Sequence, residues 1–162
     1  MFPFPSRRYV LPSCTLTRLT RAETQGLAEQ LVSLDPWRTL QYQAEALAAD
    51  LSRPDSSFAR FTVRVSGQAA GLVALRYPWL MGVYLQLLAV LPPYQGMGLG
   101  QEIMSWLERQ ARPHASNLWL TVSDFNHRAR HFYKKLGFLE VARLDNLIMG
   151  GHDEFLLRKI LV

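Results

Sequence analysis

A glycine-rich turn between an apolar strand and a helix constrains this chain more than any other feature. Residues 83–90 form a nearly unbroken apolar run, which predicts a strand in the middle of a sheet. The turn that follows, residues 95–100, has glycine at every second position. A helix is expected directly after it, because Leu99, Ile103 and Leu107 repeat at the i, i+4 and i+8 spacing of one helical face. The chain therefore contains a strand–turn–helix unit.

Such a turn is suited to binding an anion. Glycine lets the backbone approach a bulky group closely, and the first N–H groups of a helix lie unpaired at the positive end of its dipole. Pyrophosphate is a natural ligand there. A Walker A loop is excluded because Gln101 follows Gly100, and a dinucleotide fingerprint counted from Gly96 fails at the same residue. From the turn alone, a purely structural strand-to-helix connection explains the glycines equally well.

The other segments predict a mixed α/β domain, neither doubly wound nor a barrel. Thr20 and Glu23 form a capping-box pattern at the start of the first expected helix. We expect one domain over residues 1–162, with residues 1–8 flexible or peripheral. Strands are expected at 9–19, 58–65, 69–76, 83–90, 117–122, 138–144 and 154–161, and helices at 21–34, 40–51, 99–111 and 127–136.

Two motifs resemble those of the GNAT family of N-acetyltransferases. Gln95-x-x-Gly98-x-Gly100 is similar to that family's Q/R-x-x-G-x-G/A signature, and residues 126–138 are similar to its N-x-x-A…F-Y-x-x-x-G-F segment. The motifs stand in the family's order, and the resemblance covers nearly the whole chain, most weakly before residue 58. It implies a mostly antiparallel sheet of six to seven strands flanked by about four helices, with acetyl-CoA as the acyl donor and no metal.

The resemblance also implies which residues bind coenzyme A. In the family, the strand before the turn splays from its neighbour and its free backbone groups pair with the pantetheine arm. Asn126 corresponds to a polar contact to the cofactor, and asparagine is equally typical of a plain helix N-cap. The implied binding residues are Leu88, Ala89, Val90, Gln95, Gly96, Met97, Gly98, Leu99, Gly100, Asn126 and Tyr133.

Tyr133 is the expected catalytic residue. A phenol can protonate the thiolate that leaves when an amine attacks the thioester. Gly137 stands where a helix would end in the left-handed conformation, and Phe138 would then pack back on Tyr133. The alternative is a core aromatic residue whose hydroxyl is satisfied within the protein.

The acceptor and the general base are less well defined. Residues 118–122 resemble the matching strand of the enzymes that acetylate ribosomal-protein N-termini, but Thr121 stands where those have Glu, and residues 57–100 contain no Asp or Glu. Asp35-Pro36-Trp37 is similar to their Phe-Pro-Trp motif. A peptide α-amine, with a pKa of about 8, needs less help than a lysine-like amine of about 10.4. We hypothesise a water-relayed base, oriented by the Thr121 hydroxyl or by the central strands.

We expect the acceptor to be a peptide N-terminus or a small-molecule amine. Its pocket should lie between the two N-terminal helices, the central strand and the last hairpin, whose loop 149–153 would close over it. Four aromatic residues are candidates for its lining, namely Trp37, Tyr77, Trp79 and Tyr84.

Composition leaves other classes of function open. The net charge of +5 suits any anionic partner. We expect neither a nucleic-acid nor a membrane partner, whereas a catalytically silent CoA-binding module, an acetyltransferase acting on charged tRNA, and a homodimer stay open as alternatives. His127 and His131 are spaced to share a metal, but no third ligand accompanies them. The lone Cys14 and the lack of a signal peptide favour the cytoplasm.

Overall fold

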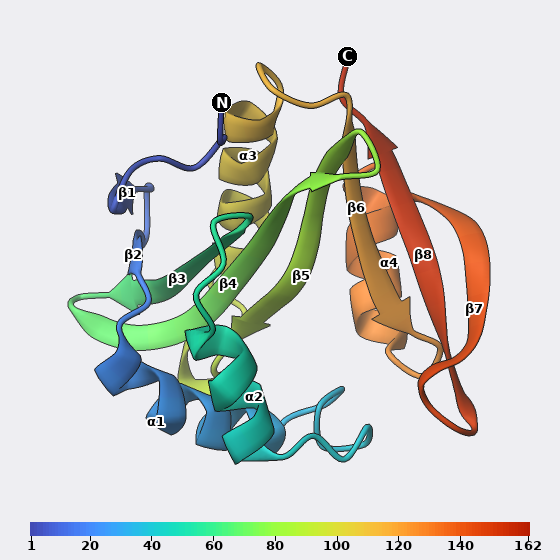
Figure 1. Ribbon diagram of the computed structural model, residues 1–162, viewed down its shortest axis with the longest axis horizontal. Coiled ribbons are helices and arrows are strands. Elements are labelled where there is room, and N and C mark those ends of the chain that lie inside the picture. Colours follow the sequence, from blue (N-terminus) through green and yellow to red (C-terminus); the bar gives the residue numbers. More distant parts are fainter.

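One eight-stranded sheet forms the frame of the molecule (Figure 1). The computed structural model describes all residues from 1 to 162. The spatial order is β1-β2-β3-β4-β5-β6-β8-β7, and every neighbouring pair is antiparallel except β5 and β6. The strands are β1 Arg8–Val10, β2 Thr15–Arg18, β3 Phe58–Val65, β4 Gln68–Trp79, β5 Gly82–Val90, β6 Asn117–Ser123, β7 Leu139–Met149 and β8 His152–Ile160.

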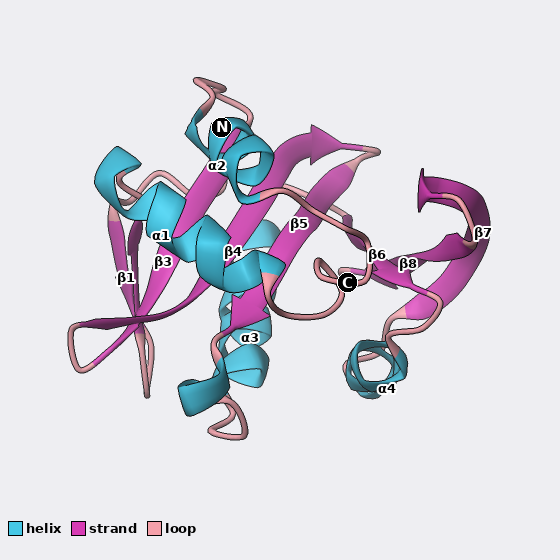
Figure 2. Ribbon diagram, turned by 90° about the horizontal axis from the view of Figure 1, so that it is seen from below, coloured by secondary structure: helices cyan, strands magenta, loops and turns pink.

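Four α-helices cover the two faces of the sheet. Helices α1 (Arg21–Val32) and α2 (Ala44–Ser52) lie on one face, and α3 (Leu99–Ala111) and α4 (His127–Lys135) lie on the other (Figure 2). Successive apolar side chains of β4 point to opposite faces of the sheet, so both faces carry an apolar core. Leu72 belongs to the core under α1 and α2, whereas its neighbour Val73 belongs to the core under α3. A short 3-10 turn, η1 (Pro92–Tyr94), carries the chain from β5 towards α3.

The two central strands separate towards their carboxyl ends, as Figure 1 shows. Pairing between β5 and β6 runs only from Gly82↔Asn117 to Leu85↔Leu120. Strand β5 continues to Val90 and stays paired with β4 on its other side. The backbone of residues 86–90 therefore has no partner strand on the β6 side, which opens the sheet at its centre.

The structure confirms the expected fold and changes some boundaries. The sheet has eight strands because the strand expected over residues 9–19 is two short strands, joined by a turn in which the Leu11 N–H donates to the Cys14 carbonyl at 2.8 Å. The second helix begins at Ala44 rather than near residue 40, because Gln41 has a positive φ of 57° and continues the preceding turn. Within the N-terminal segment expected to be flexible or peripheral, Phe4 is fully buried and packs on Trp106 with ring centroids 5.5 Å apart.

Candidate active site

A cavity of about 380 Å³ lies where β5 ends and the sheet is open. Nine of the residues predicted to bind coenzyme A line it: Leu88, Ala89, Val90, Gln95, Gly96, Gly98, Gly100, Asn126 and Tyr133. Met97 and Leu99 were also expected there, but Met97 points to solvent and Leu99 is buried in the core under α3. Arg128 adds a positive charge to the cavity wall. We call this space the first cavity.

The glycine-rich turn is shaped by backbone constraints. Gly98 is the N-cap of α3 and has φ 78°, a left-handed conformation that strains other residues. Gly100 lies inside the helix, where an added Cβ would come within 3.3 Å of Phe132 Cζ on α4. The Gln95 side chain donates a hydrogen bond of 2.9 Å to the Val90 carbonyl and so braces the turn against β5. Gly98, Gly100 and Gln101, at the start of α3, all line the first cavity.

The helix that carries Tyr133 is closed at both ends as the sequence predicts. Asn126 Oδ1 accepts a hydrogen bond of 3.2 Å from the Ala129 N–H, so the N-cap role is real. At the other end Gly137 has φ 89°, and the Phe138 N–H donates to the Tyr133 carbonyl at 3.1 Å, which completes a Schellman motif. Phe138 packs edge-on against Tyr133, with ring centroids 5.6 Å apart. The tyrosine ring is therefore held in one orientation.

The hydroxyl of Tyr133 stays free. Its ring is buried, and burial raises the pKa of the phenol above its usual value. Among fully enclosed polar side-chain atoms, only Trp106 Nε1 lacks a hydrogen-bond partner. The Tyr133 hydroxyl also has no partner, so it is not fully enclosed and is accessible from the cavity that Tyr133 lines. A neutral phenol beside a cavity can donate a hydrogen bond, or a proton, to a negatively charged atom of a bound group. This differs from the alternative of a hydroxyl satisfied in the core.

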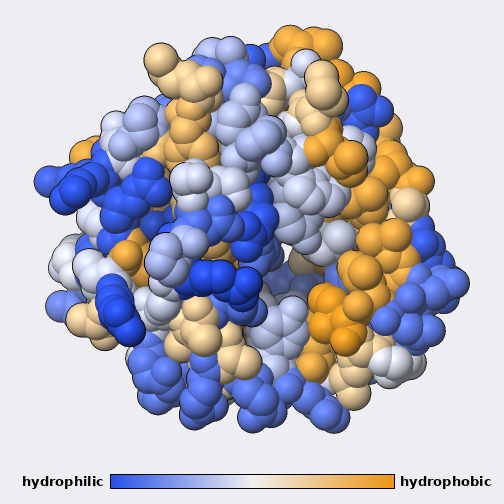
Figure 3. Space-filling view, in the orientation of Figure 1, coloured by the Kyte–Doolittle hydropathy of each residue, from blue (hydrophilic) through white to orange (hydrophobic).

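A second cavity, of about 120 Å³, adjoins the first. Figure 3 shows a hollow near the middle of the face that it displays. The two cavities share six lining residues: Pro36, Trp37, Leu88, Asn126, Ala129 and Tyr133. Tyr133 therefore stands at the junction of a space beside the helix N-terminus and a separate, smaller space between β5, β6 and the last hairpin.

The second cavity contains one charged residue, Glu154. This side chain enters from β8, where Glu154 is paired with Ser123 of β6, and it accepts a hydrogen bond of 2.5 Å from the Ser123 hydroxyl. Only 3% of Glu154 is exposed, and burial raises the pKa of its carboxyl. Glu154 is not among the predicted site residues, because the sequence places no carboxylate on the strands before the turn and a water-relayed base is expected instead. The available signal was an acidic residue directly before the apolar run Phe155-Leu156-Leu157 of the final strand.

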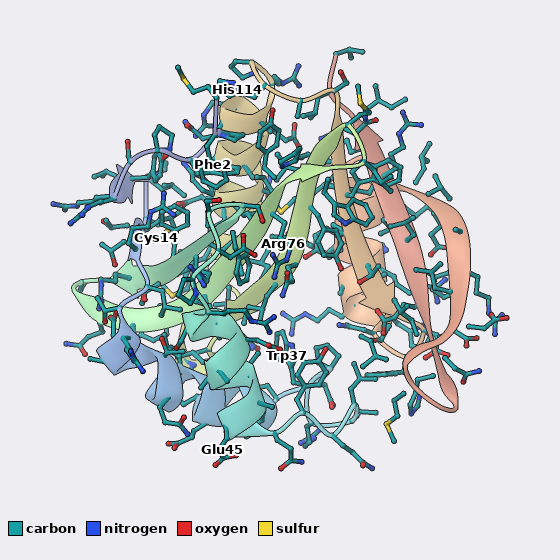
Figure 4. The ribbon with its side chains drawn as sticks, viewed as in Figure 1. Phe2, Cys14, Trp37, Glu45, Arg76 and His114 are labelled. Atoms are coloured by element: carbon teal, nitrogen blue, oxygen red, sulfur yellow. The ribbon has the colours of Figure 1, made fainter.

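Of the four aromatic residues predicted to line the acceptor pocket, only one lies at the cavities. Trp37 lies beside the opening between β5 and β6, where Figure 4 labels it, and it lines both cavities. Tyr77, Trp79 and Tyr84 were expected to line the acceptor pocket, but they line neither cavity. The Tyr77 hydroxyl bonds to the His114 carbonyl at 3.0 Å.

Tyr84 lies behind the second cavity rather than in its wall. Its ring stacks on Trp79 with centroids 4.7 Å apart, and its hydroxyl is 3.0 Å from Thr121 Oγ1. The Thr121 hydroxyl, expected to orient a water molecule, makes this hydrogen bond and also lines the second cavity. From the last hairpin it is Ile148 and Glu154 that reach the second cavity, whereas none of residues 149–153 does.

The comparisons with known proteins agree with this geometry. Residues 20–138 match the model of the acetyltransferase (GNAT) family. The chain is 28% identical to the aminoalkylphosphonate N-acetyltransferase of Salmonella typhimurium, over 82% of this chain and 89% of that protein. The structure of Ard1 from Thermoplasma volcanium superposes with a TM-score of 0.75 at 24% identity, covering 93% of this chain and 99% of that one. The ribosomal-protein-S18-alanine N-acetyltransferase of Escherichia coli superposes with a TM-score of 0.72 at 20% identity, covering 91% and 94%.

The chain therefore belongs to the GNAT family of acetyltransferases, and it is an acyl-CoA-dependent N-acyltransferase. Members of this family use acetyl-CoA. None of the helices is long and apolar enough to cross a membrane. No group of three or more His, Cys, Asp or Glu side chains is clustered as metal ligands.

Proposed function

We propose that the protein transfers the acetyl group of acetyl-CoA to a primary amine, carried by a small molecule or by a peptide N-terminus. The observation that carries this proposal is that two cavities meet at the free hydroxyl of Tyr133. One cavity has the features of a coenzyme A site and the other is small enough for an amine. Direct transfer between two substrates requires both to lie at one reactive point.

The residues around the first cavity fit coenzyme A. Its diphosphate would lie at the N-terminus of α3, where Gly98 and Gly100 leave the backbone N–H groups uncovered. The pantetheine arm would pair with the free edge of β5 at residues 88–90, as an added strand would. Asn126 uses its oxygen as the N-cap, which leaves its amide group for the same arm.

Tyr133 is proposed as the proton donor to the leaving thiolate. Its position at the junction of the cavities would place the hydroxyl beside the sulfur rather than beside the diphosphate. The phenol is protonated at neutral pH, as an acid must be, and because burial raises its pKa it gives up its proton only to a negative charge that forms beside it, as the leaving thiolate does.

The acceptor class rests on the second cavity and on the names of the relatives. One relative acts on aminoalkylphosphonates and one structural neighbour on the alanine of a ribosomal protein, so both are amine acetyltransferases. A cavity of about 120 Å³ accommodates an amine with a few carbon atoms, while the rest of an acceptor lies outside. With its single cysteine unpaired, we further propose that the protein works in the cytoplasm, which keeps thiols reduced.

The test is thiol release from acetyl-CoA in the presence of different amines. The panel should contain 2-aminoethylphosphonate, spermidine, lysine and a short peptide beginning with alanine. We expect turnover with at least one of them and a loss of about 100-fold or more in kcat for Tyr133→Phe, with CoA affinity unchanged. Phe125→Leu, outside both cavities, serves as the matched aromatic control. If CoA binds but no amine is acetylated, the silent-module alternative is favoured, and full activity in Tyr133→Phe contradicts the proton-donor role.

A further inference from the structure

We propose that Glu154 is the general base of this enzyme and that Ser123 orients it. In this proposal the Glu154 carboxylate takes the proton of the acceptor ammonium ion in the second cavity. It replaces the water-relayed base expected from the sequence, and it rests on the proposed function of amine acetylation.

The first support is the position of the carboxylate relative to the opening of the sheet. Strand β6 loses its pairing with β5 after Leu120 but stays paired with β8 as far as Ser123↔Glu154. The β6–β8 ladder thus carries Glu154 past the point at which the central strands separate. Glu154 and Tyr133 line the same small cavity, and they reach it from β8 and from α4. An acceptor amine in this cavity has a base on one side and the proposed acid on another.

The second support is that Glu154 is buried without a positive partner. It is 3% exposed and Ser123 is 2% exposed, and no ion pair involves Glu154, although ten ion pairs occur elsewhere in the protein. Burial of an unpaired carboxylate is strongly unfavourable. Its Oε1 accepts one hydrogen bond, from Ser123, and Glu154 is the only charge in a cavity otherwise lined by apolar and neutral polar groups. A cation that enters the cavity, such as a protonated amine, supplies the positive charge that this carboxylate lacks.

The surroundings make Glu154 a better base than an ordinary carboxylate. Burial is the largest influence and raises its pKa, and the charge of Asp124 raises it further. The Ser123 hydrogen bond and His152 lower it. His152 Nδ1 lies 3.6 Å from Asp124 Oδ1. Tyr42, Tyr84 and Tyr133 are the other titratable groups near Glu154, and all three are neutral phenols whose pKa values burial raises.

The proton balance closes with these two residues. Glu154 takes one proton from the ammonium ion and releases it to solvent after the reaction. The amine lone pair forms the new N–C bond, and the C–S bond breaks with its electron pair on sulfur. Tyr133 gives its proton to that sulfur and regains one from the nitrogen of the new amide. The net reaction converts an ammonium ion and acetyl-CoA into an amide, a free thiol and one proton.

The decisive experiment is the pH dependence of single-turnover acetyl transfer, with the best acceptor from the amine panel named above. For the wild type we expect the rate to rise with pH through the pKa of Glu154, because only the ionised carboxylate accepts a proton. In Glu154→Gln this acid limb should vanish and the rate at pH 7 should fall about 100-fold or more. The rate should recover above the pKa of the acceptor amine, where the amine is already neutral. Glu154→Asp should restore part of the activity at pH 7.

Ser123→Ala tests the orienting role of Ser123, because the direction in which it should shift the pH profile is known. The Ser123 hydrogen bond lowers the pKa of Glu154, so its loss should move the acid limb to higher pH. A merely structural serine would lower the rate without moving the limb. Infrared difference spectra of the carboxyl band, assigned with Glu154→Gln in the CoA-bound protein, should show the same shift independently of turnover.

Glu140→Gln is the matched control. Glu140 is a carboxylate on the neighbouring strand β7, but it pairs with Arg130 of α4 and lies outside both cavities. Its replacement should leave the pH profile unchanged. If the wild type is active and Glu154→Gln has the same rate and the same acid limb of the pH profile, Glu154 is not the general base, but the proposed function stands. No turnover by the wild type with any amine overturns both, and a Glu154 carboxyl that titrates no higher than an ordinary glutamate overturns the base even in an active enzyme.

Discussion

The turn at the start of α3 offers a direct test of why its glycines are needed, through the change Gly98→Ala. Gly98 has φ 78°, and an alanine in this left-handed region costs roughly 1–2 kcal/mol. No atom lies within 4 Å of the added Cβ, so no steric clash increases this cost. Alanine also restricts the unfolded chain, which returns roughly 0.4–1 kcal/mol. The net loss of stability should be about 1 kcal/mol, or about 2–4 °C in melting temperature for a chain of this size.

Binding of coenzyme A should suffer more than stability. If the strained turn relaxes, at least one N–H group of the helix terminus is turned away from the diphosphate. A hydrogen bond to a charged group contributes about 1.5–3 kcal/mol, so the Kd should rise about 10- to 100-fold. Calorimetric titration with coenzyme A measures the affinity, and urea unfolding followed by the fluorescence of the four tryptophans measures the stability.

Gly100→Ala is the comparison for this prediction. Gly100 lies inside the helix, where alanine is favoured by up to about 1 kcal/mol, and the new Cβ needs the tip of the Phe132 ring to move by a few tenths of an ångström. We expect stability within about 1 kcal/mol of the wild type and CoA affinity within about three-fold. Equal affinities in the wild type and Gly98→Ala would refute the explanation based on the left-handed turn.

Two further predictions follow from titratable groups elsewhere. The Ser57 hydrogen bond and then Arg76 hold the pKa of Asp55 at about 2, below the ordinary value, so its contribution to stability is present above pH 4 and is lost as the pH falls towards 2. Asp55→Asn should therefore lower the melting temperature at pH 7, and this difference should shrink steadily as the pH falls from 4 to 2. A constant difference over this range would contradict the assignment. Burial, reinforced by Glu102, raises the pKa of the Cys14 thiol to about 11, so Cys14 should react with a disulfide reagent at pH 8 only in urea. Rapid reaction in the folded state would show that the N-terminal hairpin opens.

Much of the fold was predictable because the local patterns are strong. The apolar run of β5 and the spacing of Leu99, Ile103 and Leu107 in α3 indicate their elements directly. The errors fall where tertiary contacts overrule local preference. The segment before α2 has helical composition, but residues 34–41 form turns that end with Gln41 in the left-handed region. The strand-like composition of residues 9–19 predicts one continuous strand. In the structure, Pro12-Ser13 lies in a turn that divides this segment into β1 and β2.

The residues proposed for the cofactor side of the site could also be selected from the sequence. Its residues lie in two short stretches of sequence, and their roles depend on local geometry such as the left-handed Gly98 and the Schellman motif at Gly137. The acceptor side is different. Its wall combines Trp37, Ile148 and Glu154 with β5 and β6, which are far apart along the chain. The sequence predicts its aromatic residues only from their residue type. In the structure, the Tyr77 hydroxyl bonds to the His114 carbonyl and Trp79 stacks on Tyr84, so neither residue lines this wall.

By itself, the sequence determined the turn after β5, the ends of α4 and therefore the family and the acyl donor, because each depends on interactions between residues a few positions apart. Only the tertiary structure decided which carboxylate meets the acceptor. Glu154 is 31 positions from Ser123, and the register of β6 against β8 brings the two side chains to a hydrogen bond of 2.5 Å. A shift of one residue in that register would turn Glu154 to the opposite face of the sheet. Such a choice is made by the pairing of distant strands, and no local pattern encodes it.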